Sequence, residues 1–205
     1  MISIVDYGLG NILAFANMYK RLNVPVRITS SPKQLEEAEK IILPGVGAFD
    51  WAMARLNDSG LRETLDCLVL EKKVSVIGVC VGMQIMANKS DEGVTEGLGW
   101  IDAEVKRFDE ARFSNVTHLP HMGWNDVCPV GNNPLFAGLE KDARFYFLHS
   151  YYFSPGREDQ VLAQTDYSGL FTSAAIRQNV YGVQFHPEKS HSWGMRLLKN
   201  FADFC

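Results

Sequence analysis

The sequence predicts an α/β protein with a doubly wound, mostly parallel sheet, helices on both faces and an antiparallel extension. Over the first 90 residues, short apolar runs rich in β-branched residues alternate with segments of helical spacing, which is typical of βαβ crossovers. One run, 74–79, is apolar throughout, as in strands buried on both faces of a parallel sheet. After residue 100 the chain changes to short strands between Gly, Pro and Asn turns, which indicates antiparallel pairing.

The strands and helices of the first half begin and end for local chemical reasons. Gly8 and Gly10 end the first strand, and Asn11 can then cap a helix. Ser31 followed by Pro32 is a typical helix start, with a cap and then proline at the first position. The expected strands are 2–6, 24–29, 40–43 and 74–79, and the expected helices are 12–21, one that begins at 32, 49–57, 61–72 and 83–88.

Short strands and one closing helix are expected in the second half. The strands lie at 103–108, 145–149, 161–164, 173–177 and 181–185. The last segment, 193–204, has amphipathic helical spacing, and its inward-facing residues are expected to be Leu197, Leu198, Phe201 and Phe204. Because no linker, repeat or low-complexity tract interrupts the chain, residues 1–205 are expected to form a single domain.

Composition and charge exclude several classes of protein. The chain has 205 residues, 46% of them hydrophobic and 21% charged, which is typical of a globular domain with a sizeable core. Twenty Lys and Arg against 24 Asp and Glu give a net charge of −4 without a basic run, which argues against a nucleic-acid partner. The N-terminus does not resemble a signal peptide, and no apolar stretch is long enough to span a bilayer. We therefore expect a cytoplasmic protein without a membrane partner.

The spacing of cysteines and histidines predicts neither a disulfide framework nor a metal site. The cysteines lie far apart and form no C-x-x-C pair, which is typical of a reduced intracellular chain. His118 and His121 are separated by Pro120, which disfavours the helix that would bring them onto one face. Since no His, Cys and Asp set has zinc-like spacing, no metal is expected. The four cysteines are Cys67, Cys80, Cys128 and Cys205.

The sharpest local motif is Gly78-Val79-Cys80-Val81-Gly82, where a buried strand meets a helix. In a turn of the form G-x-nucleophile-x-G, a side chain at either flanking position would collide with neighbouring backbone. The turn is expected to hold Cys80 exposed above the sheet, where a helix N-terminus favours a thiolate. The N–H of Val81 is placed to donate to an oxyanion. Taken alone, the same turn also fits a buried structural cysteine.

A second motif, His186-Pro187-Glu188, follows the apolar strand 181–185. In an extended chain, residues two apart point to the same side, so the imidazole and the carboxylate are expected to project together. A base with an orienting carboxylate is what a thiol nucleophile needs. Both motifs follow strands, and open α/β sheets carry their sites at the carboxyl ends of strands. A solvated strand-end histidine is the alternative for His186 alone, and Cys80 makes catalysis the better interpretation.

A third segment, 43–49, comes directly after the strand 40–43, which Pro44 and Gly45 are expected to stop. Its N–H groups could line the site, and Gly47 could let a peptide turn over at low cost. By itself the segment also fits a plain loop between a strand and a helix.

Together these motifs resemble the class I, triad-type glutamine amidotransferases, which are marked by a G-x-C-x-G-x-Q elbow, here Gly78 to Gln84, and by the His-Pro-Glu segment. More specific strings are similar to one branch, the glutaminase subunits of imidazole glycerol phosphate synthase. The string 120–125 is the most discriminating, because sibling glutaminases share the triad but not this segment. The likeness runs along the whole chain, and its other strings lie at 6–11, 44–49, 145–151 and 184–190.

The resemblance implies a flavodoxin-like fold and a triad that hydrolyses L-glutamine without a cofactor. Cys80 would attack the side-chain amide and form a glutamyl thioester, while His186 moves the proton and Glu188 orients the ring. The loop that completes the oxyanion hole together with Val81 matches Gly45, Val46 and Gly47. The positions that match glutamine-binding groups are Gln84, Glu92, Ser150 and Tyr151.

The resemblance also implies a second chain, a (βα)₈-barrel cyclase that receives the ammonia and makes imidazole glycerol phosphate and AICAR in histidine biosynthesis. The sequence departs from the common pattern at Val81, where Leu is more frequent, and at His118-Leu119, where a basic residue often stands. The residues that match the partner interface are Pro120, His121, Met122, Gly123, Trp124 and Asn125, together with Asn11.

Three alternatives stay open from the sequence. The segment 189–194 resembles a subgroup that supplies ammonia to an aminated surface-sugar synthase instead. A free-standing cysteine hydrolase would share the elbow but would not require Gln84, Glu92 or the segment 120–125. A non-catalytic interaction subunit is the third alternative, against which the intact Cys80, His186 and Glu188 argue.

Overall fold

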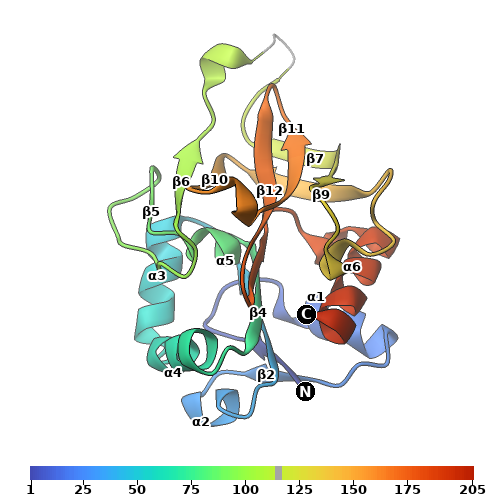
Figure 1. Ribbon diagram of the computed structural model, residues 1–205. Coiled ribbons are helices and arrows are strands. Elements are labelled where there is room, and N and C mark those ends of the chain that lie inside the picture. Colours follow the sequence, from blue (N-terminus) through green and yellow to red (C-terminus); the bar gives the residue numbers. More distant parts are fainter. Residues whose placement is uncertain (114–116) are drawn as a thin grey trace.

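In the computed structural model, which describes residues 1–113 and 117–205, helices cover both faces of a central sheet (Figure 1). Helices α1 (Ile12–Arg21) and α6 (His191–Phe204) lie together on one face. Helices α3 (Phe49–Asp58) and α4 (Arg62–Asp66) lie on the other face. No helix in the described part of the chain is long and apolar enough to cross a membrane.

The first half of the chain forms the parallel core that the sequence predicts. Its strands are β1 (Ile2–Val5), β2 (Val26–Thr29), β3 (Lys40–Gly45) and β4 (Ser75–Cys80), joined by β13 (Val180–Val183), and the short helix α2 (Pro32–Leu35) follows β2. These strands are all parallel and run in the order β2, β1, β3, β4, β13. The strand order reverses between β1 and β3, and open sheets of this kind carry their sites beside the carboxyl ends of the strands at such a point.

The second half forms the predicted antiparallel extension. Its strands are β5 (Lys89–Ser90), β6 (Ala103–Arg107), β7 (His121–Asp126), β8 (Cys128–Pro129), β9 (Arg144–His149), β10 (Tyr151–Pro155), β11 (Val161–Asp166) and β12 (Leu170–Arg177). From β13 the sheet continues antiparallel through β12, β10 and β6, and β5 lies parallel to β6 at the end. Strands β11 and β8 branch from β12, while β7 and β9 form a separate antiparallel pair.

Two strand predictions need correction. The strand expected at 181–185 belongs to the parallel core, because its hairpin with β12 leaves its other edge free to pair in parallel with β4. The strand expected to stop before Pro44 continues to Gly45. Strand β1 pairs with β3 only as far as Ile42, so the missing N–H of Pro44 removes no hydrogen bond on that side. Strands β7 and β10 and the two-residue strands β5 and β8 were not predicted.

The helix predictions also need correction at several ends. The helix expected at 83–88 is α5 (Val81–Gln84), which is one turn long and begins directly after Cys80. The helix expected at 61–72 is α4 followed by a π-helical turn at Cys67–Glu71. Asn11 and Ser31 precede their helices as expected, but neither side chain makes a capping hydrogen bond.

The closing helix buries three of the four residues expected to face inward. Leu197, Leu198 and Phe201 are fully buried, whereas Phe204 is 62% exposed and its expected burial is wrong. Lys40 Nζ donates to the carbonyl oxygens of Phe201 and Ala202 at 2.9 and 2.7 Å. The last turn is therefore held to the sheet by a charged cap instead of by its final aromatic ring.

Candidate active site

Three parallel strands end at one edge of the sheet and position the predicted catalytic segments. Strand β3 ends at Gly45, β4 ends at Cys80, and β13 ends shortly before His186. Cys80 has φ +56° and ψ −115°, a conformation that residues with side chains rarely adopt, and α5 begins at the next residue. The chain therefore turns sharply at the thiol, as the G-x-C-x-G pattern predicts.

Three glycines let backbone segments touch around this turn. A Cβ atom on Gly78 would lie 2.5 Å from the carbonyl oxygen of Gly82. A Cβ atom on Gly82 would come closer still to the carbonyl oxygen of Leu43, and one on Gly45 to the nitrogen of Gly82. The prediction that the flanking positions exclude larger side chains is thus confirmed. The end of β3 is pressed against the turn that carries Cys80.

Cys80 is only 3% exposed, so the expectation of an exposed nucleophile is wrong. Its Sγ lies 3.9 Å from the carbonyl oxygen of Leu148 in β9 and 3.8 Å from Nε2 of Gln184. These two neighbours contribute to the burial of the thiol. The thiol borders a cavity of about 290 Å³, which is large enough to admit a small substrate.

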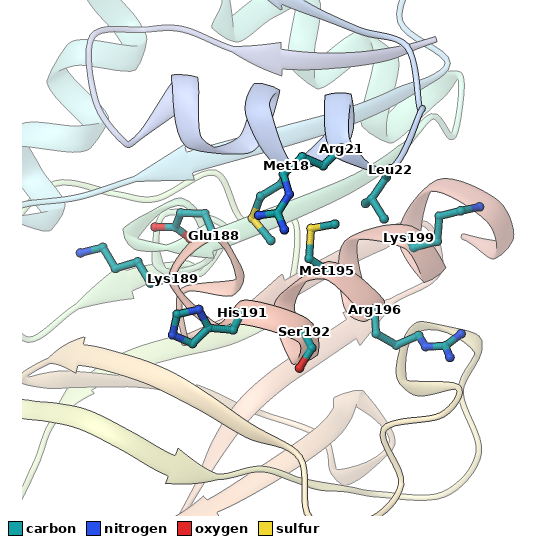
Figure 2. Close-up of a pocket in the computed structure, with 10 residues that line it drawn as sticks. All are labelled: Met18, Arg21, Leu22, Glu188, Lys189, His191, Ser192, Met195, Arg196 and Lys199. Carbon is teal, nitrogen blue, oxygen red and sulfur yellow. The ribbon is translucent and has the colours of Figure 1, made fainter.

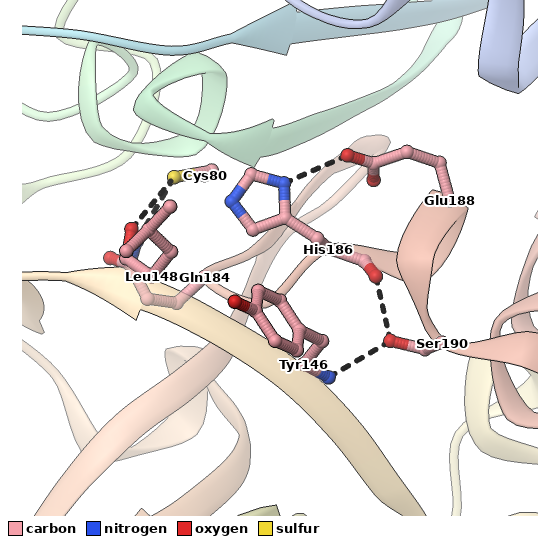
Figure 3. Close-up of polar contacts among 7 residues, drawn as sticks. All are labelled: Cys80, Tyr146, Leu148, Gln184, His186, Glu188 and Ser190. Atoms are coloured by element: carbon pink, nitrogen blue, oxygen red, sulfur yellow. Dashed lines mark hydrogen bonds and ion pairs between the residues drawn. The ribbon is translucent and has the colours of Figure 1, made fainter. Parts of the chain in front are cut away.

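His186 lies between Cys80 and Glu188 (Figure 3). Its Nδ1 is 2.8 Å from Oε1 of Glu188, and both side chains are buried. The predicted pairing of imidazole and carboxylate is confirmed, although the expected extended backbone is wrong. Pro187–Lys189 form a 3₁₀ turn, and this turn brings the carboxylate back to the ring.

The backbone at His186 is anchored to β9. The N–H of His186 donates to the carbonyl oxygen of Tyr146 at 2.8 Å. The fully buried hydroxyl of Ser190 donates to the carbonyl oxygen of His186 at 2.6 Å and accepts from the N–H of Tyr146 at 3.0 Å. These three hydrogen bonds, of which Figure 3 draws the two that Ser190 makes, fix the imidazole relative to the strand that covers the thiol.

The surroundings of His186 favour its protonated form. Burial alone would lower its pKa, but hydrogen bonds and charges from Cys80 and Glu188 outweigh burial and raise the pKa from 6.5 to about 10. An imidazolium beside a sulfur atom favours the anionic, nucleophilic form of that sulfur. The arrangement therefore suits a thiol nucleophile with a histidine as its proton carrier.

The cavity beside Cys80 brings together most of the predicted site residues. Its lining includes Cys80 and His186 with the predicted oxyanion residues Val46, Gly47 and Val81 and the predicted substrate residues Gln84, Glu92, Ser150 and Tyr151. Pro120 of the predicted partner segment also lines it. Gly45 and Glu188 are not among its lining residues: Gly45 lies against the backbone of Gly82, and Glu188 contacts the ring of His186.

Two of the predicted substrate residues are held by hydrogen bonds within the chain. Gln84 Nε2 donates to the carbonyl oxygen of Tyr151 at 3.1 Å and to Oε1 of Gln184 at 3.0 Å. Oε2 of Glu92 accepts from the N–H of Phe49 at 2.8 Å, at the first residue of α3. Both side chains therefore have fixed positions on the cavity wall.

Four further residues of the site were not predicted from the sequence. Leu148, His149 and Lys189 line the cavity, and Gln184 is fully buried against Cys80. The sequence could have indicated Gln184 as a site residue, because it is a polar residue inside the apolar run 181–185. Buried polar side chains are uncommon and usually have a specific hydrogen-bonding role.

The predicted partner segment presents two faces because most of it is strand β7. Met122 and Trp124 are exposed, whereas the side chain of His121 is buried and faces inward, away from any partner surface. Leu148 lies opposite Met122 in β9 and is also exposed. An apolar surface made of Met122, Trp124 and Leu148 therefore borders the cavity. Asn11 is exposed at the start of α1.

A second hollow lies between α1 and α6, behind Glu188 (Figure 2). With a volume of about 690 Å³ it is larger than the cavity beside Cys80, but neither Cys80 nor His186 lines it. Cys80 and His186 therefore belong to the smaller cavity. Within residues 1–113 and 117–205, no group of His, Cys, Asp and Glu is arranged to hold a metal ion. The cationic residues of the hollow are Arg21, Lys189, Arg196 and Lys199.

Comparison with known proteins gives full-length matches. The family model for class-I glutamine amidotransferases matches residues 3–204. Imidazole glycerol phosphate synthase subunit HisH of Bdellovibrio bacteriovorus is 59% identical over 99% of this chain and 100% of that protein. HisH of Leptospira interrogans is 50% identical over 98% of this chain and 99% of that protein. Subunit HisH 2 of Pseudomonas aeruginosa is 47% identical over 99% of both.

Solved structures share the fold at much lower identity. A crystal structure of a glutamine amidotransferase has a TM-score of 0.74 and 18% identity, covering 98% of this chain and 96% of that chain. A glutamine amidotransferase of Thermotoga maritima has a TM-score of 0.63 and 18% identity, covering 98% of this chain and 82% of that chain. The predicted α/β architecture is confirmed.

The raised pKa of His186 makes the stability of the fold depend on pH. Because the folded chain binds the imidazole proton more tightly than the unfolded chain, the stabilisation is fully present below pH 6.5 and is lost as the pH rises to about 10. Over that range we expect His186 to lower the free energy of unfolding by up to about 1.4 kcal/mol per pH unit.

Urea unfolding of the unsubstituted chain and of His186→Gln, from neutral pH to about pH 10, measures this contribution. The stability of the unsubstituted chain should fall more steeply with pH than that of the variant. Equal slopes would contradict the assigned pKa.

Proposed function

The chain belongs to the class-I glutamine amidotransferases and, within them, to the HisH subunits of imidazole glycerol phosphate synthase, and we propose that Cys80, His186 and Glu188 are its catalytic triad. As the glutaminase subunit of this synthase it serves histidine biosynthesis. One observation carries the proposal of the triad. A buried thiol and imidazole line the same cavity, and the imidazole contacts a buried carboxylate at 2.8 Å.

In the first half-reaction, Sγ of Cys80 attacks the carbon of the glutamine carboxamide. The thiol proton is held by His186, and the carbonyl oxygen becomes an oxyanion. When the tetrahedral intermediate collapses, the C–N bond breaks and His186 gives the proton to the leaving nitrogen. Ammonia departs and a glutamyl thioester stays on Cys80. Glu188 holds Nδ1 of the ring, so that Nε2 faces the sulfur and the substrate.

In the second half-reaction, water attacks the thioester. His186 takes a proton from the water, the hydroxyl adds to the carbonyl carbon, and the C–S bond breaks. The proton held by His186 returns to the sulfur, and glutamate leaves. The sum of both steps is glutamine plus water giving glutamate plus ammonia.

Two backbone segments support an oxyanion hole. The N–H of Val81 follows the nucleophile directly, in the first turn of α5. Val46 and Gly47 line the same cavity as Val81. Gly47 has φ +91°, and a Cβ atom there would contact only Trp51, at 3.9 Å. The loop thus has room to reorient its peptide. Glycine adopts positive and negative φ about equally readily, so this reorientation costs little conformational energy.

The glutamine pocket is expected between Gln84, Glu92, Ser150 and Tyr151. A carboxylate at Glu92 suits the α-ammonium group of the substrate, and backbone N–H groups around Ser150 and Tyr151 suit its α-carboxylate. All four residues line the cavity that Cys80 borders. A free-standing hydrolase would not need this zwitterion-binding set.

The apolar surface of Met122, Trp124 and Leu148 suits the cyclase partner. Leu148 contacts both the proposed nucleophile and the proposed partner surface. Its carbonyl oxygen lies 3.9 Å from Sγ of Cys80, while its side chain is exposed on that surface. Ammonia released at the thiol therefore has a short path to the partner. Exposed apolar patches beside an active site are typical of interaction surfaces.

The nucleophile assignment predicts the behaviour of Cys80→Ala. Without the sulfur no thioester forms, so glutamate release by the complex should fall on the order of 10⁴-fold or more. Binding to the cyclase should be unchanged, because Cys80 is buried. Cys128→Ala, which removes an exposed cysteine, is the matched control and should keep full activity. Substantial glutamate release by Cys80→Ala would overturn the assignment.

The oxyanion proposal predicts the behaviour of Gly47→Val. Valine disfavours φ near +91° and restricts reorientation of the peptide, so kcat in the complex should fall about 10²–10³-fold with a much smaller change in KM. Gly60→Val, at φ +71° in open surroundings away from the cavity, is the control for backbone strain alone. Equal effects on kcat and KM, or equal effects of both variants, would assign the loop a structural role.

Steady-state glutamine hydrolysis by the chain, alone and with a histidine-pathway cyclase and its nucleotide ligand, tests the partner. Little turnover alone and strong stimulation in the complex are expected. Because the segment 189–194 also fits the surface-sugar subgroup, the synthase of that pathway is the second partner to test. Stimulation by that synthase only would transfer the proposal to it.

A further inference from the structure

Two buried histidines outside the triad, His121 of β7 and His149 of β9, lie beside the cavity, and His149 lines it. They are opposite each other in the β7–β9 register, and His121 Nδ1 is 3.0 Å from His149 Nε2. His149 Nδ1 lies 2.8 Å from the carbonyl oxygen of Tyr151, and His121 Nε2 lies 3.2 Å from Nδ2 of Asn125. These four residues form one row of polar contacts from β7 to the wall of the substrate cavity.

The direction of every hydrogen bond in this row follows from the Tyr151 end. A carbonyl oxygen can only accept, so Nδ1 of His149 must carry a proton and donate. In a neutral imidazole the other nitrogen is then an acceptor, so His149 Nε2 requires a donor. Nδ1 of His121 is the atom that faces it and must carry the proton. Nε2 of His121 is therefore an acceptor in turn.

The Asn125 end gives the same direction independently. Oδ1 of Asn125 accepts from the N–H of Asp126 at 2.8 Å, and Nδ2 donates to the carbonyl oxygen of Asp166 at 2.9 Å. The amide orientation is thus determined by backbone groups on both sides. Its Nδ2 can only donate to His121, which agrees with the acceptor role deduced from the other end. All donors in the row point toward Tyr151.

Both imidazoles are neutral, as this assignment requires. Burial and the neighbouring His121 lower the pKa of His149 to about 3, and burial lowers the pKa of His121 to about 4. A second proton on His149 would place two donors face to face at 3.0 Å, and a second proton on His121 would face the donor Nδ2 of Asn125 at 3.2 Å. The pair is therefore not a proton acceptor in catalysis.

The carbonyl oxygen of Tyr151 is where this row meets the active site. It also accepts from Nε2 of Gln84, which donates to Gln184, and Nε2 of Gln184 lies 3.8 Å from Sγ of Cys80. The backbone at Tyr151 lines the cavity at its predicted substrate end. The position of one carbonyl group thus depends on donors from both His149 and Gln84.

We propose that His149 and His121 are positioning residues for glutamine, which hold the Tyr151 carbonyl through a row of one-way hydrogen bonds that starts at Asn125. The proposal rests on the proposed glutaminase site. In the absence of the row, the carbonyl keeps only its bond from Gln84, and the pocket wall loses its fixed position. Because the wall contacts the non-reacting end of glutamine in both ground and transition states, KM should rise while kcat changes little.

Ring packing is the competing explanation for the two histidines. The His121 ring stacks on Phe147 at 4.6 Å and on Tyr167 at 3.9 Å, and Phe171 contacts both histidine rings. A purely structural role needs an aromatic ring at 121, whereas the row needs a donor at the position of Nδ1. Two substitutions at the same residue separate these requirements.

His121→Phe keeps the ring and removes the donor, whereas His121→Asn removes the ring and keeps an N–H near the position of Nδ1. We expect His121→Phe in the complex to raise KM for glutamine about tenfold, the usual effect of one lost buried hydrogen bond, and His121→Asn to stay near the unsubstituted value. Phe171→Leu is the packing control, and thermal unfolding of each complex checks the fold. Normal KM in His121→Phe with raised KM in His121→Asn and Phe171→Leu would overturn the proposal.

Nitrogen NMR of histidine-labelled complex tests the row without any substitution. His121 and His149 should both be protonated at Nδ1 and not at Nε2 and should keep this form from mildly acidic to mildly basic pH. Protonation at Nε2, or titration of either ring near its ordinary pKa of about 6.5, would overturn the proposal. Failure of the unsubstituted complex to hydrolyse glutamine would instead refute the proposed function, and it would leave the NMR result unaffected.

Discussion

The close contact between the end of β3 and the turn after Cys80 is the constraint on which the active site depends. Gly45, Gly78 and Gly82 bring three backbone segments within distances that no side chain allows. The contact holds Cys80 at φ +56° and places Gly45 against the backbone of Val81 and Gly82. Strain at the nucleophile is maintained because the parallel core on both sides of β4 is rigid and buried.

The second half of the site comes from the small antiparallel pair β7 and β9. Strand β9 covers the thiol with the carbonyl of Leu148, and the backbone of Tyr146 in β9 anchors His186. The same pair turns Met122 and Trp124 outward and His121 inward. The proposed site is therefore assembled where a rigid parallel core, which supplies Cys80, meets a two-stranded layer whose outer face carries the exposed Met122 and Trp124.

The sequence predicted the parallel core, the elbow and the contact of His186 with Glu188 because each depends on local chemistry, such as glycine at a tight turn. It did not predict β7, whose pattern is inverted: the polar His121 is buried while the apolar Met122 and Trp124 are exposed. Strand prediction from alternating apolar and polar residues assumes that the apolar face is buried. The prediction therefore fails for a strand whose apolar face is exposed. The burial of Cys80 depends on Leu148 and Gln184, which are distant in sequence, and local pattern carries no information about such contacts.

The enclosure of the Cys80 thiol also determines which reagents can react with it. Cys128 is exposed, whereas Cys80 is reached through a cavity of about 290 Å³. Oxidation and alkylation of cysteine follow both thiolate character and access. Bulky electrophiles and oxidising proteins therefore react first at Cys128, while small molecules reach the sulfur of Cys80, the proposed nucleophile. The fold therefore selects by size the reagents that reach this sulfur and protects it from large ones.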